Sequence, residues 1–325
     1  VGRRRVVTTP TERGHRVSSF NKDAYGKILV PLVTPFGDDQ EVDYDRARSL
    51  IRFLITNDNA DSLVLTGTTG EFHTMSIDER VRLFELAKEE FGDEIASIAG
   101  VGCASTKDTI LLARRAEALG YETIMVVAPY YAKPNQRELY DHFAAVAGAV
   151  AINVMLYNIP IFTGVNVDPE IVGRLAEVPN IVAIKEEAEL NPKQMTEFMN
   201  ATPEDFVIYN GDDTMILEAF AQGGEERVGG VISGASHLIG KRIRDMINTF
   251  LSGDVRRASE VQRSLLPLFR VMGQNNRTNP VALWKEALRL AGVNAGVPRL
   301  PLSRGTEEEI GNVRSVLLSL GLLDE

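Results

Sequence analysis

From Lys27 onward, short apolar runs alternate with amphipathic stretches, and this alternation restricts the possible folds more than any other feature of the chain. Eight of the runs are predicted to be strands: 28–33, 62–65, 97–100, 123–127, 153–156, 181–184, 206–209 and 228–232. Successive strands begin roughly 25 to 35 residues apart, the length of a strand–helix unit, and their continuous apolar character suits parallel strands covered on both faces. Eight such units predict an α/β fold, the (β/α)₈ TIM barrel. The alternative is a doubly wound open sheet, but no dinucleotide-binding fingerprint follows the first strand.

Signals at helix ends place helices between several of these strands. Ser76 and Glu79 match a capping box at the start of 76–91. Gly120 follows 106–119 as a stop signal, and Asp168 with Pro169 begins another helix as its cap and first helical residue. The other helices predicted in this region are 43–56 and 213–222, the latter ending at Gly223-Gly224.

Beyond about residue 240 the pattern is purely helical, and the helices predicted there are 241–251, 254–272, 279–290 and 306–320. They complete the eighth unit and add a small C-terminal helical extension. We therefore expect a flexible tail at 1–25, the barrel at 26–240, and the last barrel helix with the extension at 241–325.

The composition argues against several classes of function. The net charge is −10 with an isoelectric point near 5.1, whereas nucleic-acid binding calls for a basic surface. No apolar run is long enough for a membrane span, and the basic start of the chain lacks the apolar stretch of a secretory signal. Cys103 is the single cysteine, which excludes an internal disulfide and the zinc patterns. It lies in an apolar stretch, so we expect it to be a small core residue, and a lone cysteine fits a cytoplasmic protein. The histidines have no ligand spacing, and no metal site is expected: His15, His73, His142 and His237.

Lys185 directly follows four apolar residues, Ile181–Ile184, at the end of the sixth predicted strand. A lysine amine is charged at pH 7, but burial disfavours the ammonium and lowers its pKa. A neutral amine can attack a carbonyl carbon and form a Schiff base. By itself the segment also fits a lysine at the solvent-exposed end of a strand, so the residues at the other strand ends are needed to decide.

Polar groups suited to ligand binding follow several other predicted strands, where the catalytic groups of a (β/α)₈ barrel lie. The second strand leads into Gly67-Thr-Thr-Gly-Glu71, whose backbone N–H groups and hydroxyls could bind a carboxylate, although a tight turn would also explain it. Other strand ends carry Pro129-Tyr130-Tyr131, Tyr157-Asn158 and Gly211-Asp212-Asp213. A lysine, a tyrosine one strand away and a hydroxyl-rich loop would together supply a nucleophile, a proton relay and an anion site.

These motifs resemble those of the dihydrodipicolinate synthase / N-acetylneuraminate lyase family, whose members are class I, Schiff-base lyases that handle pyruvate. The resemblance runs over about residues 26–320, in the segments Gly67–Glu71, Pro129–Pro134, Tyr157–Gly164, Ile184–Glu186 and Gly211–Asp213. It implies a lyase that forms or cleaves a C–C bond, or dehydrates, at a 2-keto acid. It implies neither a metal nor an organic cofactor.

The resemblance also implies a catalytic role for four positions. Lys185 would form the imine with pyruvate or a 2-keto acid. Tyr157 would transfer protons, because a hydrogen-bond chain eases the loss of its phenol proton. The Thr68 hydroxyl would link Tyr157 to Tyr131, which a neighbouring subunit of a homotetramer would supply.

The expected substrate-binding residues are Thr69, Gly67, Ile232, Phe162 and Asp213. Thr69, with the backbone just before it, would hold the substrate carboxylate, and Ile232 would line the pyruvate pocket. Phe162 departs from the synthases, which have an arginine there that binds the carboxylate of aspartate semialdehyde. A phenyl ring cannot make that contact, whose loss costs on the order of 2–5 kcal/mol in a buried site. Asp213 could instead accept a hydrogen bond from a substrate hydroxyl.

A second departure is the acidic run Glu186-Glu187-Ala188-Glu189, which stands where the synthases usually have a small Ala-Thr/Ser-Gly run. Acids at this place suit the recognition of hydroxyls or the repulsion of a second carboxylate. Side chains that simply face solvent would explain the run equally well.

The leading prediction is a class I lyase or aldolase that acts on a 2-keto(-3-deoxy) acid with hydroxyls, through an imine on Lys185. The alternative is 4-hydroxy-tetrahydrodipicolinate (dihydrodipicolinate) synthase, which condenses pyruvate with aspartate semialdehyde and which Phe162 disfavours. A second alternative is a non-catalytic ligand-binding barrel, although the complete set Lys185, Tyr157, Thr68 and Tyr131 counts against it. The expected partners are a small keto acid and further copies of the chain.

Overall fold

A computed structural model describes residues 20–188 and 191–324. Parallel strands follow one another around a closed barrel, which the pairing of β1 with β8 completes. The strands are β1 Ile28–Pro31, β2 Ser62–Leu65, β3 Ala96–Gly100, β4 Thr123–Val127, β5 Asn153–Asn158, β6 Ile181–Glu186, β7 Val207–Asn210 and β8 Val228–Ile232. The predicted (β/α)₈ TIM barrel is therefore confirmed.

Strands β5 and β6 each continue two residues beyond their predicted ends, to Asn158 and Glu186. The apolar runs stop earlier, but backbone pairing continues because it does not depend on apolar side chains. As a result Tyr157 and Lys185 lie within their strands and are direct partners in the β5–β6 register.

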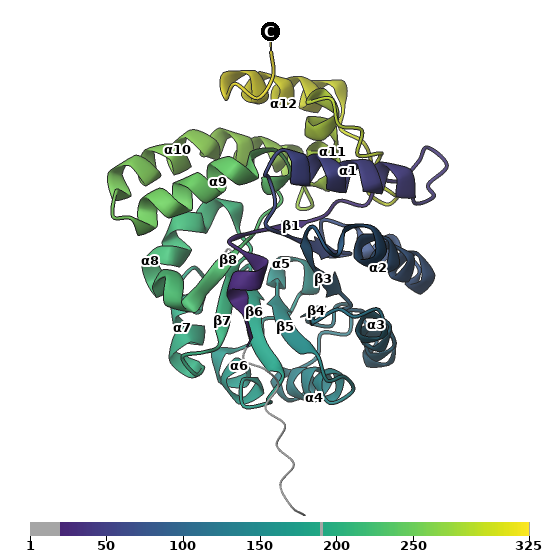
Figure 1. Ribbon diagram of the computed structural model, residues 1–325, viewed down its shortest axis with the longest axis vertical. Coiled ribbons are helices and arrows are strands. Elements are labelled where there is room, and N and C mark those ends of the chain that lie inside the picture. The colour runs from purple at the N-terminus through teal and green to yellow at the C-terminus, as the bar shows by residue number, and fades with distance from the viewer. Residues whose placement is uncertain (1–19, 189–190, 325) are drawn as a thin grey trace, which may run out of the picture.

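Helices surround the strands, as Figure 1 shows. They are α1 Tyr44–Thr56, α2 Ile77–Phe91, α3 Thr106–Ala118, α4 Gln136–Ala147, α6 Pro169–Leu175, α7 Gln194–Ala201, α8 Ile216–Arg227 and α9 Ser236–Leu251, with the single turn α5 Pro160–Thr163 after β5. Their apolar stripes face inward, as in α1, where Ala47, Leu50, Ile51 and Leu54 are buried.

The predicted capping box of α2 is present. Ser76 Oγ accepts from the Glu79 N–H at 3.2 Å, and Glu79 accepts from the Ser76 N–H at 2.8 Å. The box of α4, formed by Asn135 and Glu138, has the same geometry and a similar sequence pattern, although we did not predict it.

Two helix starts differ from prediction. Asp168 stands at the cap position of α6, but its carboxylate accepts from Asn166 at 3.2 Å and not from the helix. The helix predicted at 213–222 begins later than predicted, because a 3₁₀ turn, Asp213–Met215, precedes α8. Gly224 adopts a non-helical conformation (φ 59°, ψ −168°) that breaks α8, so the predicted stop at Gly223-Gly224 coincides with a kink before the last residues of the element.

The C-terminal extension consists of α10 Val255–Met272, α11 Val281–Leu290 and α12 Glu307–Ser319, at the top of Figure 1. The element α9 begins at Ser236 but is kinked at Ile239 (φ −127°), so its longer part begins close to the expected boundary near residue 240. Of the expected tail, residues 1–19 lie outside the described residues. Lys22–Tyr25 form a 3₁₀ turn, and Tyr25 donates a hydrogen bond to Thr123 at the start of β4.

Side chains fill the interior of the barrel. The buried residues of this inner core include Leu29, Val64, Ile98, Met125, Met155, Ala183, Val207, Tyr209 and Ile232. A larger apolar core lies between the strands and the helices. Because the interior is packed, a ligand can bind only at the ends of the barrel.

Candidate active site

Lys185 and Tyr157 meet at the C-terminal ends of β6 and β5. The Lys185 Nζ donates to the Tyr157 hydroxyl at 3.1 Å and lies 4.2 Å from the centre of the phenol ring. Lys185 is 4% exposed and Tyr157 is 1% exposed. The interpretation of Lys185 as the solvent-exposed end of a strand is therefore wrong.

A cavity of about 440 Å³ opens beside this pair. The structure brings to its lining most of the predicted site residues: Thr68, Thr69, Tyr157, Phe162, Lys185, Asp213 and Ile232. Gly67 lies behind the cavity, next to a small void of about 10 Å³ that Thr68 and Tyr157 also border. Tyr131 is not part of the lining; it is 94% exposed and adopts φ 71° after β4.

Glu187, the residue after β6, points back into the cavity. Its Oε2 accepts from the Tyr157 hydroxyl at 2.8 Å and lies 3.1 Å from the Lys185 Nζ. Thr68 Oγ1 is 3.4 Å from the same hydroxyl oxygen. The sequence left open whether this acid faces solvent, and the structure places it in the site. The available signal was an acid at a position where the resembling synthases have a small residue.

The surroundings of Tyr157 favour its protonated form. Burial is the main cause that raises the pKa of Tyr157 well above its ordinary value of 10.0, and the Glu187 carboxylate raises the pKa further. The hydrogen bond with Thr68 acts in the opposite direction but is outweighed. In this arrangement the phenol is therefore protonated and donates a hydrogen bond to Glu187, and the expected role of Tyr157 in proton transfer stays a prediction.

Two further buried carboxyl groups lie near Glu187, and one of them, Asp213, lines the cavity. Glu186 is buried, accepts from Asn158 and Gln194 at 3.0 Å each, and has its pKa raised to about 7, chiefly by burial. Asp213 accepts from the Ala235 N–H at 3.0 Å, and burial raises its pKa to about 6. The Glu187 charge contributes to both increases in pKa. Of the acidic run, Glu189 lies outside the described residues.

The loop that carries Thr68 and Thr69 is fixed by a buried ion pair. Glu71 Oε1 and the Lys285 Nζ of α11 are 2.5 Å apart, with side chains 0% and 1% exposed. The other Glu71 oxygen accepts from the Arg299 N–H at 2.8 Å. Sequence reasoning missed this cluster, because Glu71 is more than 200 residues from both Lys285 and Arg299.

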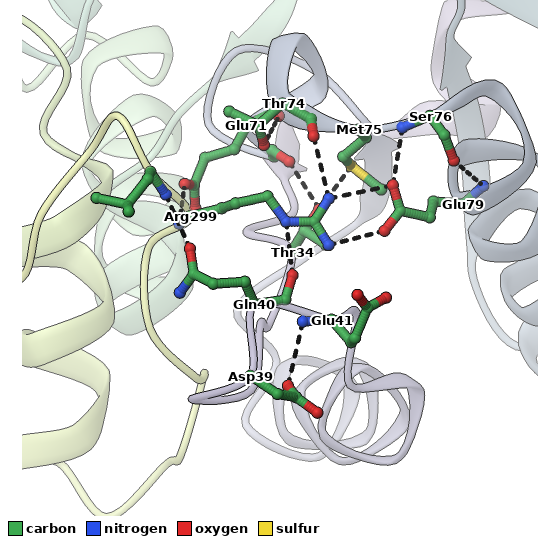
Figure 2. A network of polar contacts seen from close by, with 12 residues as sticks. Thr34, Asp39, Gln40, Glu41, Glu71, Thr74, Met75, Ser76, Glu79 and Arg299 are labelled. Atoms are coloured by element: carbon green, nitrogen blue, oxygen red, sulfur yellow. Dashed lines mark hydrogen bonds and ion pairs between the residues drawn. The ribbon is translucent and has the colours of Figure 1, made fainter.

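Figure 2 shows how the side chain of Arg299 extends this network across the loop. Its guanidinium donates to the Thr74 carbonyl at 3.0 Å and to Glu79 at 2.7 Å. Burial lowers the pKa of Lys285 to about 8 and raises the pKa of Glu71, while the attraction between the two charges opposes both changes. The C-terminal extension thereby holds the loop from behind the cavity.

Two other titratable residues considered from the sequence, His237 and Cys103, make contacts within the fold. His237 is fully buried and its Nε2 accepts from the Val33 N–H at 3.2 Å, and Cys103 is partly buried beside Arg80. Within residues 20–188 and 191–324, no three histidine, cysteine or carboxylate side chains form a group that could hold a metal ion. None of the helices in these ranges is both long enough and apolar enough to cross a membrane.

A parallel (β/α)₈ barrel with a buried lysine and tyrosine in contact at the C-terminal strand ends defines a Schiff-base-forming lyase. The chain belongs to the dihydrodipicolinate synthetase family, whose model it matches over residues 24–319.

Curated relatives and solved structures agree with this assignment. The chain is 44% identical over 299 residues to the 4-hydroxy-tetrahydrodipicolinate synthase of Desulforudis audaxviator, covering 92% of this chain and 99% of that one. It is 43% identical over 301 residues to the synthase of Desulforamulus reducens, with 92% and 98% covered. The dihydrodipicolinate synthase of Cyanidioschyzon merolae, solved with lysine bound, superposes with a TM-score of 0.86 at 37% identity, with 92% and 99% covered. A synthase from Bacillus anthracis gives 0.84 at 36% identity, with 91% and 98% covered.

Proposed function

We propose that the enzyme forms its imine between Lys185 and the keto carbon of pyruvate or another 2-keto acid. The observation that carries the proposal is the 3.1 Å contact between the Lys185 Nζ and the Tyr157 hydroxyl beside the cavity. The amine nitrogen attacks the keto carbon, and loss of water from the adduct leaves an iminium ion. The Glu187 carboxylate, 3.1 Å from this nitrogen, stabilises the positive charge in a water-poor site.

The substrate carboxylate is assigned to Thr69 and to the backbone N–H of Thr68. Both residues line the cavity in a loop that Glu71 fixes through its buried ion pair. A loop that is already ordered binds an anion without the further loss of conformational freedom that a mobile loop would suffer. Ile232 provides an apolar wall for the small carbon skeleton of pyruvate.

The second half of the substrate is proposed to carry hydroxyl groups and no second carboxylate. The cavity lining near the lysine contains Glu187 and Asp213, which accept hydrogen bonds and repel anions. Phe162 is apolar, and the other lining cation, Arg277, is held by Glu309 at 2.7 Å. A 2-keto-3-deoxy acid, cleaved to pyruvate and an aldehyde or dehydrated, fits these groups best.

The second candidate is condensation of pyruvate with aspartate semialdehyde. The names of relatives that are 42–44% identical over more than nine-tenths of this chain support it. Phe162 counts against it, because the cavity then has no free cation at that place for the second carboxylate. The two candidates share the imine and differ only in what occupies the outer part of the cavity.

An assembly in which Tyr131 enters the site of a neighbouring subunit is proposed as well. The tyrosine is almost fully exposed at the turn after β4, in a strained positive-φ conformation. Sedimentation equilibrium should give a homotetramer. A monomer that is fully active at the same concentration would contradict the proposal.

Borohydride reduction in the presence of pyruvate tests the imine. We expect an irreversible mass increase that maps to the peptide containing Lys185 and to no other lysine. A complete lack of adduct with pyruvate and a panel of 2-keto acids would reject both candidate reactions. Turnover with hydroxylated 2-keto-3-deoxy acids, compared with turnover of aspartate semialdehyde, then separates the two.

The substitution Phe162→Arg tests whether the missing cation at this position disfavours aspartate semialdehyde as substrate. A guanidinium at the cavity mouth should raise kcat/KM with aspartate semialdehyde about 10- to 100-fold, since one charge-assisted contact is worth on the order of 1.5–3 kcal/mol. Phe162→Leu, which changes shape without adding charge, is the matched control. High kcat/KM with aspartate semialdehyde before any substitution would overturn our interpretation of Phe162.

A further inference from the structure

The Tyr157 hydroxyl oxygen is surrounded by three polar atoms, and only one of them is a carboxylate. The Lys185 Nζ donates a hydrogen bond to this oxygen at 3.1 Å, and Thr68 Oγ1 lies 3.4 Å from it. Glu187 Oε2 accepts a hydrogen bond from the hydroxyl at 2.8 Å. The shortest of these contacts thus leads from the phenol to Glu187. The same carboxylate oxygen lies 3.1 Å from the Lys185 nitrogen that is proposed to react.

The local backbone and a distant glycine together allow this placement. The Glu187 N–H donates to the Asn158 carbonyl at 3.1 Å, which continues the β5–β6 pairing and fixes the start of the side chain. Gly211, at the end of β7, faces both groups. A Cβ at this position would lie 2.9 Å from Glu187 Oε2 and 2.5 Å from Lys185 Cε. The absence of a side chain at residue 211 therefore leaves the space that the lysine and the carboxylate occupy.

We propose that Glu187 is a catalytic residue of this enzyme, the group that stores the proton which Tyr157 transfers. The inference rests on the proposed imine chemistry at Lys185. Tyr157 then acts as a relay: its hydroxyl takes a proton from the substrate while it gives its own proton to Glu187. A phenol whose pKa is raised by burial is a poor store for a negative charge, whereas a carboxylate holds that charge readily.

The step balances for cleavage of a 2-keto-3-deoxy acid bound as its iminium ion. The C4 hydroxyl passes its proton to the Tyr157 oxygen, and the Tyr157 proton moves to Glu187 Oε2. The C4–O electrons form the aldehyde carbonyl as the C3–C4 bond breaks. The electron pair of that bond forms the C2=C3 double bond of the enamine, and the π pair of the C2=N bond moves onto the iminium nitrogen. Return of the proton from Glu187 through Tyr157 to C3 restores the iminium ion, and water then releases pyruvate.

The charged and titratable groups that face Glu187 come from several elements. They are Lys185 and Glu186 on β6, Tyr157 on β5, and Asp213 after β7. These groups place one amine and two further carboxyl groups around the Glu187 side chain.

Exchange of the pyruvate methyl protons in D₂O, followed by proton NMR, tests the relay without any aldehyde. The enamine forms and collapses each time a C3 proton is lost and a deuteron returns. We expect Glu187→Gln to reduce the exchange rate about 100-fold or more, the usual size of a general acid–base contribution, while borohydride still traps pyruvate on Lys185. Glu187→Asp should recover part of the exchange. Asp141→Asn, which removes one exposed carboxylate from α4, is the control for charge and should exchange at the wild-type rate.

The possible outcomes distinguish the role of Glu187 from the imine at Lys185 on which that role depends. Failure of the unaltered protein to trap pyruvate or any member of the panel of 2-keto acids would overturn the imine at Lys185 itself. Normal trapping with wild-type exchange in Glu187→Gln would overturn the role of Glu187 and leave the imine intact. Loss of both trapping and exchange in Glu187→Gln would also count against a proton store, because Glu187 would then be needed for forming the imine.

Discussion

Lys185–Glu187 and Lys285–Glu71 are both lysine–glutamate pairs with buried lysines, but their surroundings differ. The Lys185 side chain is 6% exposed and that of Glu187 20%, and both line the cavity. The side chains of Lys285 and Glu71 are 1% and 0% exposed. The Lys285 Nζ donates to the Val297 carbonyl as well as to Glu71.

The comparison shows that burial alone does not make a lysine a nucleophile. Burial lowers the pKa of Lys285 to about 8, yet its nitrogen is enclosed by Glu71, a carbonyl oxygen and the Phe36 ring, 4.7 Å away. No space remains there for a carbonyl carbon to approach. Lys185 has as many close partners, Tyr157 and Glu187, but its side chain also lines a cavity. Reactivity therefore requires access in addition to removal from water.

The largest expected effect comes from removing the cavity lysine. Lys185→Met should lower kcat by at least about 10⁴-fold, because no other group can form the covalent intermediate. The measurement is turnover together with borohydride trapping of pyruvate. Lys285→Met is the counterpart on the enclosed side and should keep the adduct on Lys185. An adduct that persists in Lys185→Met would break the distinction between the two lysines.

Next in size is the effect of the enclosed pair on stability. Lys285→Met leaves the Glu71 carboxylate buried without its partner, which should lower the free energy of unfolding by about 3–5 kcal/mol. Urea titration measures this. Lys241→Met is the matched control, since its partner Asp245 is an exposed residue on α9 and such pairs contribute little. Equal destabilisation by the two substitutions would show that enclosure of the Glu71 pair has no energetic consequence.

The smallest effect is a pH dependence at the edge of the extension. Arg277 holds the pKa of Glu309 at about 2, below its ordinary value of 4.5. Between these values the folded protein binds fewer protons than the unfolded chain, so its stability decreases as pH falls from about 4.5 to 2. We expect a loss on the order of 1 kcal/mol between pH 5 and 3 that is specific to this residue. Glu309→Gln should remove that part of the slope in urea titrations, and an unchanged slope would assign acid sensitivity to other groups.

Most of the barrel could be predicted because each element carries its own local signal. The apolar runs at 123–127 and 228–232 coincide with β4 and β8, and the Ser76–Glu79 pattern forms its capping box. These signals depend on neighbours a few residues away. Deviations arose where backbone pairing extended an element, as in β5 and β6, or where a 3₁₀ turn took the place of a predicted helix start, as before α8.

The residue types of the site were also visible in the sequence, whereas their contacts were not. Lys185 and Tyr157 stand at strand ends where a barrel presents its chemistry, and a resemblance to known lyases assigned them roles. The direction of the Glu187 side chain depends on Gly211, which belongs to another strand. The enclosure of Glu71 depends on Lys285, 214 positions away.

By itself, the sequence of this protein determined the periodic pattern that makes a barrel and the positions at which reactive side chains appear. The tertiary structure decided which lysine faces a cavity and which is enclosed, and that the phenol donates its hydrogen bond to a carboxylate. The physical reason is that hydrophobic periodicity acts over one helical turn or one strand pair. Desolvation, charge and access are instead set by atoms brought together from distant parts of the chain.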